Sequence, residues 1–587
     1  MWLLGVSPSH DASAALLRDG VVVAAIAEER LTRVKGDGGR LPRRSIERVL
    51  QIAGIDRRDV DGIAVVPDRF PEDCIRHPRL GRDLERRARA WRDRVLRRPV
   101  RDVAIDHVQR ALRRMGREAA LESYVETGRF LRREGFRPDT RLRFFDHHLC
   151  HAMAAAACSG FDDAAVVTVD GVGNLGVHHT SGVFRDGALR RLAVSDTPGT
   201  SAGWFYEEIT RLLGFRPLRH EGKVLGLAAW GDPKPLGEAF RRALRCASSG
   251  RTLTSDFVGR PRADADRVAY LADVIRGHSR EDVAAAAQRT LEEAVLPLVQ
   301  NAIEETGVRH VALNGGVFAN VRLNQHVAGL PGVERVFVFP GMSDTGNSVG
   351  AALLAMAADD PPGFARARRT LDTVYWGPGY DEAEIQAGLA AAGLRYERVP
   401  EPELAARTAR AVHEGLVVGW FQGRMEFGPR ALGNRSIVAS PVDATINKRL
   451  NDRLSRTEFM PFAPSVLAEH AATIFQQVAP LRHTAEFMTV TLDVAPAWRP
   501  RIPAVVHVDG TARPHIVVRD RNPLFHRLIE CYEQLSGIPV VLNTSFNVHE
   551  EPIVCAPAEA ARALVESRVD RLAIGPFWAT RPATPPA

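Results

Sequence analysis

Two histidines four positions apart, His147 and His151, have the residue type and spacing in this sequence that point most directly to chemistry. An alanine-rich run from Ala152 to Ala157 follows them and favours a helix. Side chains four positions apart lie on one face of a helix, so both imidazoles would project together. Paired neutral imidazoles suit a divalent transition metal. The alternative is an ordinary helix start, with Asp146 as its N-cap and both histidines on the surface.

The elements that must position these histidines are indicated by a unit that occurs twice. A strand, a polar turn, a strand, an Asp-Gly turn and a strand follow one another in residues 2–27 and again in residues 164–194. The two dipeptides, Asp19-Gly20 and Asp186-Gly187, are typical of hairpins. The same order found twice indicates an internal repeat. Two facing units of this kind resemble the duplicated fold of actin and the sugar kinases, whose turns bind nucleotide phosphates. The alternative is two unrelated hairpins.

Two further turns follow predicted buried strands. Gly315-Gly316 comes after a strand predicted at 311–314, and Asp344 lies in a loop ahead of an alanine-rich helix predicted at 349–358. Glycines at such a turn let the backbone approach a ligand closely.

Length and composition narrow the class of protein. A chain of 587 residues is too long for one core, so at least two domains are expected. The net charge of +7 fits anionic small substrates as well as nucleic acid. The Arg-rich stretch 75–140, with Leu84 to Trp91 as an example, interleaves its charges with acidic residues, which argues for a helical insertion and against a nucleic-acid arm.

Cysteine usage and hydropathy favour a cytoplasmic protein. The six cysteines are scattered without a CxxC pair, so neither a disulfide framework nor a zinc knuckle is expected. No signal peptide and no membrane-spanning run is predicted.

The C-terminal part carries candidate anion-binding residues. After a linker predicted at 361–380, a strand at 417–421 leads into a Gly/Pro-constrained loop with three arginines, and planar guanidinium groups bind carboxylate or phosphate through paired hydrogen bonds. A second strand at 539–542 runs into Ser545 and Asn547, whose side chains should point the same way. Their alternative is a turn that closes the strand. The arginine candidates are Arg424, Arg430 and Arg435 in the loop, with Arg456 and Arg513 further on.

Several long motifs carry a family resemblance over nearly the whole chain. They are Asp146–Ala152, Glu221–Ala228, Phe427–Ser436, Pro461–Ser465, His507–Arg513 and Leu542–Asn547. In this order they resemble the O-carbamoyltransferases of nodulation-factor and antibiotic biosynthesis.

The resemblance implies an α/β fold in two domains. Residues 1–360 would form an actin-like duplicated domain similar to the tRNA threonylcarbamoyl transferases, with 75–140 as an insertion that helps to shape the acceptor cleft. Residues 381–587 would form a YrdC-like domain that makes carbamoyl-adenylate. The Ser-x-Asn element of that domain is present, but Leu454 stands where many relatives carry the lysine of a Lys-x-Arg element. Arg453 or Lys448 are candidates to replace it.

The reaction implied by the resemblance has two stages. Carbamoyl phosphate and ATP, with Mg²⁺, give carbamoyl-adenylate, and a free hydroxyl of a small-molecule acceptor then takes the carbamoyl group. Iron(II) is the favoured metal, with zinc or manganese as alternatives. His10 would deprotonate the hydroxyl; its alternative is a turn histidine bonded to backbone. The implied metal ligands are His147, His151, Asp170 and Asp344, and the implied nucleotide contacts are Gly315, Gly316, Asn320 and, with less support, Lys223. The implied carbamoyl phosphate and ATP contacts are Arg424, Arg430, Arg456, Arg513, Ser545 and Asn547.

Two other functions fit parts of the pattern. A tRNA threonylcarbamoyl transferase would use the same first domain and gains support from the basic charge. A non-enzymatic nucleotide switch of the actin type would leave the histidine pair and the second domain without a role. A homodimer is the default expectation for an enzyme of this size.

Overall fold

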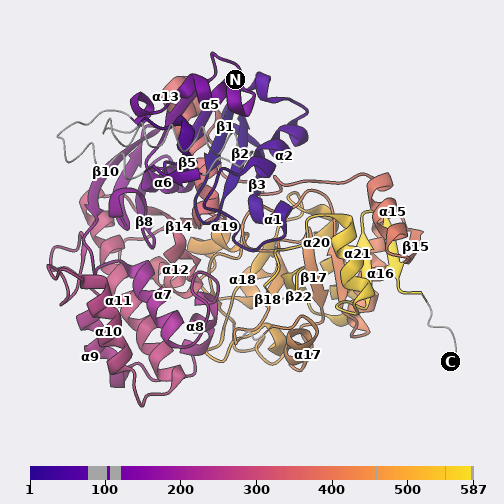
Figure 1. Ribbon diagram of the computed structural model, residues 1–587. Helices are drawn as coiled ribbons and strands as arrows, with labels where there is room; N and C mark the ends of the chain where they lie inside the picture. The colour runs from indigo at the N-terminus through magenta and orange to yellow at the C-terminus, as the bar shows by residue number, and fades with distance from the viewer. Residues whose placement is uncertain (77–101, 106–120, 457–458, 549, 583–587) are drawn as a thin grey trace.

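The computed structural model of the protein describes residues 1–76, 102–105, 121–456, 459–548 and 550–582 (Figure 1). Two five-stranded sheets within it share one strand order, β3-β2-β1-β4-β7 and β10-β9-β8-β13-β14. In each, a meander of three antiparallel strands is followed by two parallel ones. The strands of the first sheet are β1 (Trp2–Ser7), β2 (Ser13–Arg18), β3 (Val21–Ala27), β4 (Gly62–Val65) and β7 (Arg141–Phe144). Those of the second are β8 (Ala164–Val169), β9 (His179–Arg185), β10 (Ala188–Ser195), β13 (His310–Asn314) and β14 (Arg335–Val338). The internal repeat predicted from the hairpins is therefore confirmed.

Both predicted Asp-Gly turns close hairpins in the way their residues favour. Asp19 and Gly20 have φ of 49° and 83°, and Asp186 and Gly187 have φ of 52° and 75°. Two successive left-handed residues define the turn whose twist matches that of the flanking strands.

Two helices pack against each other between the sheets. α13 (Asn347–Asp359) lies on β1, β2 and β4, and α6 (His147–Cys158) lies on β8 and β13. A Cβ atom at Gly350 would lie 1.9 Å from the carbonyl oxygen of Cys150, so the helix backbones touch directly there. This contact brings the start of α6 next to the turn that precedes α13.

A third, eight-stranded sheet carries the C-terminal part, in the order β15-β24-β23-β16-β17-β22-β18-β21. Helix α16 (Glu401–His413) packs against α20 (Pro523–Ser536), and α15 (Glu382–Ala391) against α21 (Pro557–Val565). The strands are β15 (Arg395–Arg398), β16 (Val418–Phe421), β17 (Arg435–Ala439), β18 (Ala463–Leu467), β21 (His515–Val517), β22 (Val540–Ser545), β23 (Arg571–Ile574) and β24 (Phe577–Thr580). The expected α/β class is thus confirmed for both parts.

The segment predicted as a linker, 361–380, is partly helical. α14 (Pro361–Ala367) begins after Asp360, whose side chain accepts a hydrogen bond of 2.9 Å from the Gly363 N–H. Asp-Pro-Pro is a favourable helix start, because proline at the first helical positions lacks only an N–H that would have no partner in the helix.

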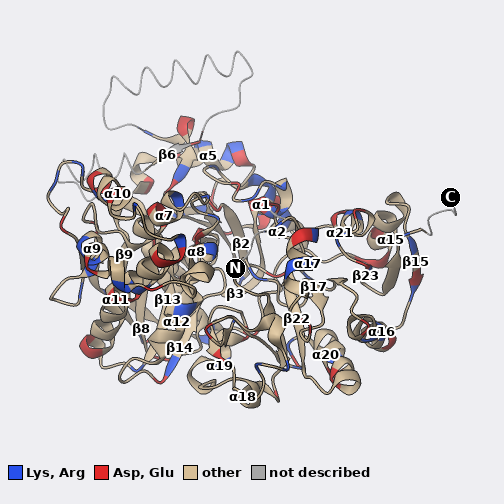
Figure 2. Cartoon of the chain, turned by 90° about the horizontal axis from the view of Figure 1, so that it is seen from below, with Lys and Arg blue, Asp and Glu red and all other residues tan. Residues whose placement is uncertain are grey.

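The predicted insertion 75–140 is described only in part. Its stretch Leu84 to Trp91 lies outside the described residues, while β6 (Asp102–Ala104) pairs with β5 (Arg69–Pro71) and α5 (Thr127–Glu134) follows. Figure 2 shows basic and acidic residues side by side near α1 (Glu28–Thr32), α2 (Arg43–Ala53) and α5. Within the described ranges, no helix combines the length and the apolar character that a bilayer crossing needs.

Candidate active site

Four side chains converge at the contact between the two helices. The Nε2 atoms of His147 and His151 lie 3.2 Å apart, one turn apart on α6. Asp170, directly after β8, places Oδ2 at 3.1 and 3.2 Å from the two nitrogens. Asp344, after β14, places Oδ1 at 3.3 and 3.4 Å from them. The four expected metal ligands are thus brought together, and Asp146 also caps α6 through the Leu149 N–H.

The buried cluster fits a divalent cation. Its four residues are buried and offer ligand atoms that all lie within 4.8 Å of one another. Asp344 Oδ1 is buried and has no hydrogen-bond partner among the described residues. Two imidazoles and two carboxylates are ligands that iron(II), zinc and manganese all accept.

The imidazoles and carboxylates of this cluster shift one another's pKa values. Burial lowers the pKa of His147, but the carboxylates of Asp344 and Asp170 outweigh it and raise that pKa well above its usual value. Burial would raise the pKa of Asp344, yet His147 and His10 hold it well below its usual range. A bound cation would compete with protons for the same imidazole and carboxylate groups.

His10 lies beside the cluster and not in it. Its Nδ1 is 3.0 Å from Asp344 Oδ2, its Nε2 is 3.6 Å from Asp11 Oδ2, and half of its side chain is exposed. Burial acts to lower its pKa, but Asp344 and Asp11 raise the pKa to about 10.

The neighbouring histidine on α6 has a packing role. His148 Nδ1 lies 2.8 Å from Thr168 Oγ1, and Nε2 lies 3.0 Å from the carbonyl oxygen of Val177. Burial lowers its pKa to about 3, so this imidazole is neutral and takes no part in the cluster.

The Gly-Gly turn supports Asp170. Gly315 has φ of 106°, and a Cβ atom there would lie 2.3 Å from the Val169 carbonyl oxygen. The Gly316 N–H donates to Asp170 Oδ1 at 3.2 Å. Asn320 caps α12 (Val321–Ala328) through the Leu323 N–H. Of these predicted nucleotide contacts, Gly315, Gly316 and Asn320 do not themselves line the large cavity described next, whereas their neighbours Ala319 and Val321 do.

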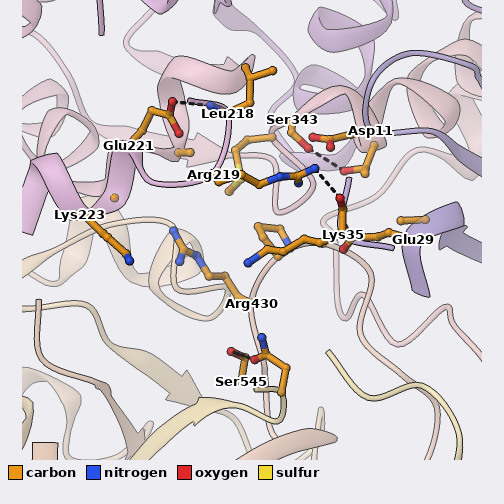
Figure 3. Close-up of a pocket in the computed structure, with 18 of the residues that line it drawn as sticks. Asp11, Glu29, Lys35, Leu218, Arg219, Glu221, Lys223, Ser343, Arg430 and Ser545 are labelled. Atoms are coloured by element: carbon orange, nitrogen blue, oxygen red, sulfur yellow. Dashed lines mark hydrogen bonds between the residues drawn. The ribbon is translucent and has the colours of Figure 1, made fainter. Parts of the chain in front are cut away.

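A cavity of about 420 Å³ lies between the first two sheets and the third. Cationic side chains from both parts line it: Arg30, Lys35, Arg219, Lys223, Arg430, Arg456 and Arg513. Asp11, Ser343 and Thr345 also line it, so it reaches the immediate neighbours of His10 and Asp344. Figure 3 shows Lys35, Lys223 and Arg430 pointing into it from different segments, with Ser545 on the opposite wall. The seven cationic residues outnumber the five acidic residues of the lining, so the lining carries a net positive charge, which suits a polyanion. The acidic residues are Asp11, Glu29, Asp37, Glu221 and Glu550.

Arg456 organises the Ser-x-Asn element. Its Nη1 donates to Thr544 Oγ1 at 2.9 Å, and its Nη2 donates to Ser545 O at 2.9 Å and to Asn547 O at 2.8 Å. Ser545 Oγ donates to Asn547 Oδ1 at 2.6 Å, so the two side chains lie on one side as the alternation predicted.

The residues considered as replacements for the missing lysine point elsewhere. Leu454 is 1% exposed and packs in the core. Arg453 Nη1 lies 3.0 Å from Asp570, in an ion pair. Arg453 and Lys448 do not occur in the described cavity lining.

Two loop arginines bind the backbone. Arg424 donates to the carbonyl oxygens of Gly377, Val23 and Trp376, at 3.0, 2.9 and 2.5 Å. Arg435 is fully buried, donates to four carbonyl oxygens and lies 3.6 Å from the centre of the Phe421 ring. Arg430 alone of the three loop arginines lines the cavity among described residues. The predicted role of Arg424 in anion binding stays a prediction, and its described contacts are to backbone carbonyl oxygens.

Several charged residues that line the cavity were not predicted from the sequence, among them Asp11, Lys35 and Arg219. A signal existed for Lys35, which precedes the Gly-rich turn Gly36 to Gly39, where backbone can approach a ligand closely. Arg219 donates to the Lys35 carbonyl oxygen at 2.5 Å and so fixes that turn.

Comparison with known proteins finds relatives that match most of this chain. Nodulation protein NolNO of Sinorhizobium fredii is 34% identical over 97% of this chain and 78% of its own length. The 3'-hydroxymethylcephem-O-carbamoyltransferase of Streptomyces clavuligerus is 27% identical over 79% of this chain and 85% of its own. The solved structure of T. kodakarensis HypF aligns over 62% of this chain and 47% of its own, at 14% identity and a TM-score of 0.30, which is too low to bear on the fold.

Two protein-family models also match. One, described as the carbamoyltransferase N-terminus, covers residues 2–353, and the other, the carbamoyltransferase C-terminus, covers residues 409–581. The chain therefore belongs to the carbamoyltransferase family of enzymes.

Proposed function

We propose that the protein is an ATP-dependent O-carbamoyltransferase that carbamoylates a hydroxyl of a small natural product through carbamoyl-adenylate. The observation that carries the proposal is the shared cavity, which combines cationic side chains of both parts with the neighbours of His10 and Asp344. The name of one relative, a 3'-hydroxymethylcephem-O-carbamoyltransferase, supports a small-molecule hydroxyl as the acceptor.

In the first stage, water releases phosphate from carbamoyl phosphate, and a carbamate oxygen then bonds to the α-phosphorus of ATP as the bond to pyrophosphate breaks. Both substrates are dense in negative charge, and Mg²⁺ accompanies ATP. Arg430, Arg456 and Arg513 would neutralise that charge, supported by Lys223 across the cavity. Ser545 and Asn547, held by Arg456, would shape this end of the site as in a YrdC-like domain at 381–587.

In the second stage, the acceptor oxygen bonds to the carbamoyl carbon, and the bond from that carbon to AMP breaks. The hydroxyl proton would pass to His10 Nε2, because Asp344 holds the opposite nitrogen, Nδ1. His10 must be neutral before it can accept this proton. The negative charge of Asp344 favours the protonated imidazole, so that charge must be partly offset for His10 to act as a base.

A metal ion bound by the four clustered side chains would offset that charge. His147, His151, Asp170 and Asp344 would hold a divalent ion, with iron(II) favoured over zinc or manganese, and the ion supplies positive charge and Lewis acidity when bound. With the charge of Asp344 shared in this way, the pKa of His10 would fall from about 10 toward neutrality.

The test needs no knowledge of the acceptor. Excess enzyme is mixed with [α-³²P]ATP, Mg²⁺ and carbamoyl phosphate, quenched, and the labelled products are separated. We expect labelled AMP or bound carbamoyl-adenylate, formed only with carbamoyl phosphate present. Labelled ADP as the sole product, or AMP formed equally without carbamoyl phosphate, would rule out the adenylate route.

A further inference from the structure

The loop that carries Arg430 is long and irregular, so something must hold its shape. Residues 422–434 join β16 to β17, although Phe421 and Arg435 are already paired neighbours in the sheet. Gly428 and Gly433 have φ of 112° and 91°. A Cβ atom at Gly433 would lie 2.5 Å from the Phe525 ring, so this turn has no room for a side chain.

A single buried carboxylate oxygen gathers the returning half of that loop. Glu426 Oε1 accepts hydrogen bonds from the N–H groups of Leu432, Asn434 and Arg435, at 2.8, 2.7 and 3.1 Å. Glu426 is 4% exposed and does not line the described cavity. Hydrogen bonds to a charged acceptor are about twice as strong as neutral ones, so the three together favour one loop conformation.

Two asparagine side chains also hold the backbone of this loop. Asn434 Nδ2 donates to the Arg424 carbonyl oxygen at 2.7 Å, and Asn543 Nδ2 donates to that of Ala431 at 3.1 Å. Arg430 therefore lies in a short stretch fixed before it by Glu426 and directly after it by Ala431.

We propose that Glu426 is a positioning residue for the phosphate-binding end of the cavity, acting through Arg430. The identity of the bound anion rests on the proposed function, whereas the loop geometry does not. The charge of Glu426 holds the loop so that the Arg430 guanidinium meets a phosphate group, and loss of that charge weakens anion binding while leaving the fold in place.

The experiment measures binding of inorganic pyrophosphate to the full chain by calorimetry, in the wild type, Glu426→Gln, Arg430→Ala and the double variant. We expect Glu426→Gln to weaken binding about tenfold, and the double variant to bind no more weakly than Arg430→Ala, because residues that act as a unit are not additive. The inference would be overturned if the losses of affinity in the two single variants added up in the double variant, or if Glu426→Gln bound pyrophosphate as tightly as the wild type.

Two further variants separate positioning from general destabilisation. Glu208, also a buried carboxylate, accepts from Arg267 Nε and Nη2 at 3.0 Å and does not occur in the described cavity lining, so Glu208→Gln should lower the melting temperature without changing pyrophosphate binding. Ser436 Oγ accepts the Gly433 N–H at 3.1 Å, so Ser436→Ala disturbs the same loop mildly and should weaken binding about twofold even if Glu426→Gln fails to fold.

The outcome also distinguishes this inference from the proposed reaction. If the wild type binds pyrophosphate and forms no AMP, the adenylate route fails while the role of Glu426 is still tested. If AMP forms and Glu426→Gln has an unchanged KM for carbamoyl phosphate and ATP, the role of Glu426 fails alone.

Discussion

At the scale of single residues, the cluster at the start of α6 makes the sharpest prediction. His151→Ala removes one of four candidate ligands, whose atoms lie within 4.8 Å of one another. We expect the bound metal per chain to fall at least about tenfold, by elemental analysis of the purified protein. The matched control is His148→Asn, next to the cluster on α6 but bonded to Thr168 and Val177. It should keep its metal and lose only stability; equal metal in all three proteins would contradict the assignment.

Arg456 tests whether a guanidinium is needed at the Ser-x-Asn element. It donates at once to Thr544, Ser545 and Asn547, which a lysine ammonium cannot reproduce in one plane. We expect Arg456→Lys to raise the KM for ATP roughly tenfold in the AMP-forming assay. Arg449→Lys, at an exposed arginine that donates to Gly415, is the control. A lower melting temperature with an unchanged KM would assign Arg456 a structural role only.

At the scale of elements, a feature could be predicted where a local residue pattern specifies the backbone conformation. Asp19-Gly20 and Asp186-Gly187 specify hairpins because their left-handed conformations suit few other residues. The spacing of His147 and His151 specified one face of α6. Irregular loops have no such pattern, so the sequence did not predict that Arg430 lines the cavity while Arg424 contacts backbone carbonyl oxygens. The support of Asp170 by Gly316 depends on strands distant in sequence and was equally hidden.

A buried carboxyl beside α19 (Arg482–Ala485) predicts a pH dependence of stability. Burial raises the pKa of Glu486 from 4.5 to about 7, with Arg482 opposing it, and its side chain is 13% exposed. Below pH 4.5 both states hold the proton. Between 4.5 and 7 the unfolded chain loses it first, so stability falls as pH rises, and the loss is complete above 7, at about 3 kcal/mol or less.

The variant Glu486→Gln should therefore gain melting temperature relative to the wild type as the pH is raised from 4.5 to 8, measured by scanning calorimetry. Glu414→Gln, at an exposed position in the same part of the chain, should show no such change. A difference for Glu486→Gln that is constant over the range would refute the shifted titration.

At the scale of the whole molecule, arginines join the two parts through backbone acceptors. Arg33 donates to Ile553 O and Pro552 O at 2.8 and 2.7 Å, and Arg30 donates to Gly428 O at 3.0 Å. Backbone carbonyl oxygens do not titrate, so these hydrogen bonds hold the cavity walls together over a wide pH range. Part of the chain's basic character thus serves internal assembly.

Arg424 allows the role of these contacts to be tested by activity, because it ties its own loop both to β3 and to the segment before the third sheet. Arg424→Ala leaves three carbonyl oxygens without that donor, which loosens the cavity walls. On the proposed route, carbamoyl-adenylate would then escape and hydrolyse, so AMP should form at near the wild-type rate while less carbamoylated acceptor appears per AMP. With a hydroxyl acceptor that the wild type accepts, we expect that ratio to fall by about half or more. Arg499→Ala removes a comparable contact, to Val494 O within one part, and should leave the ratio unchanged. An equal fall in AMP and product would mean that Arg424 supports the fold and not the retention of the intermediate.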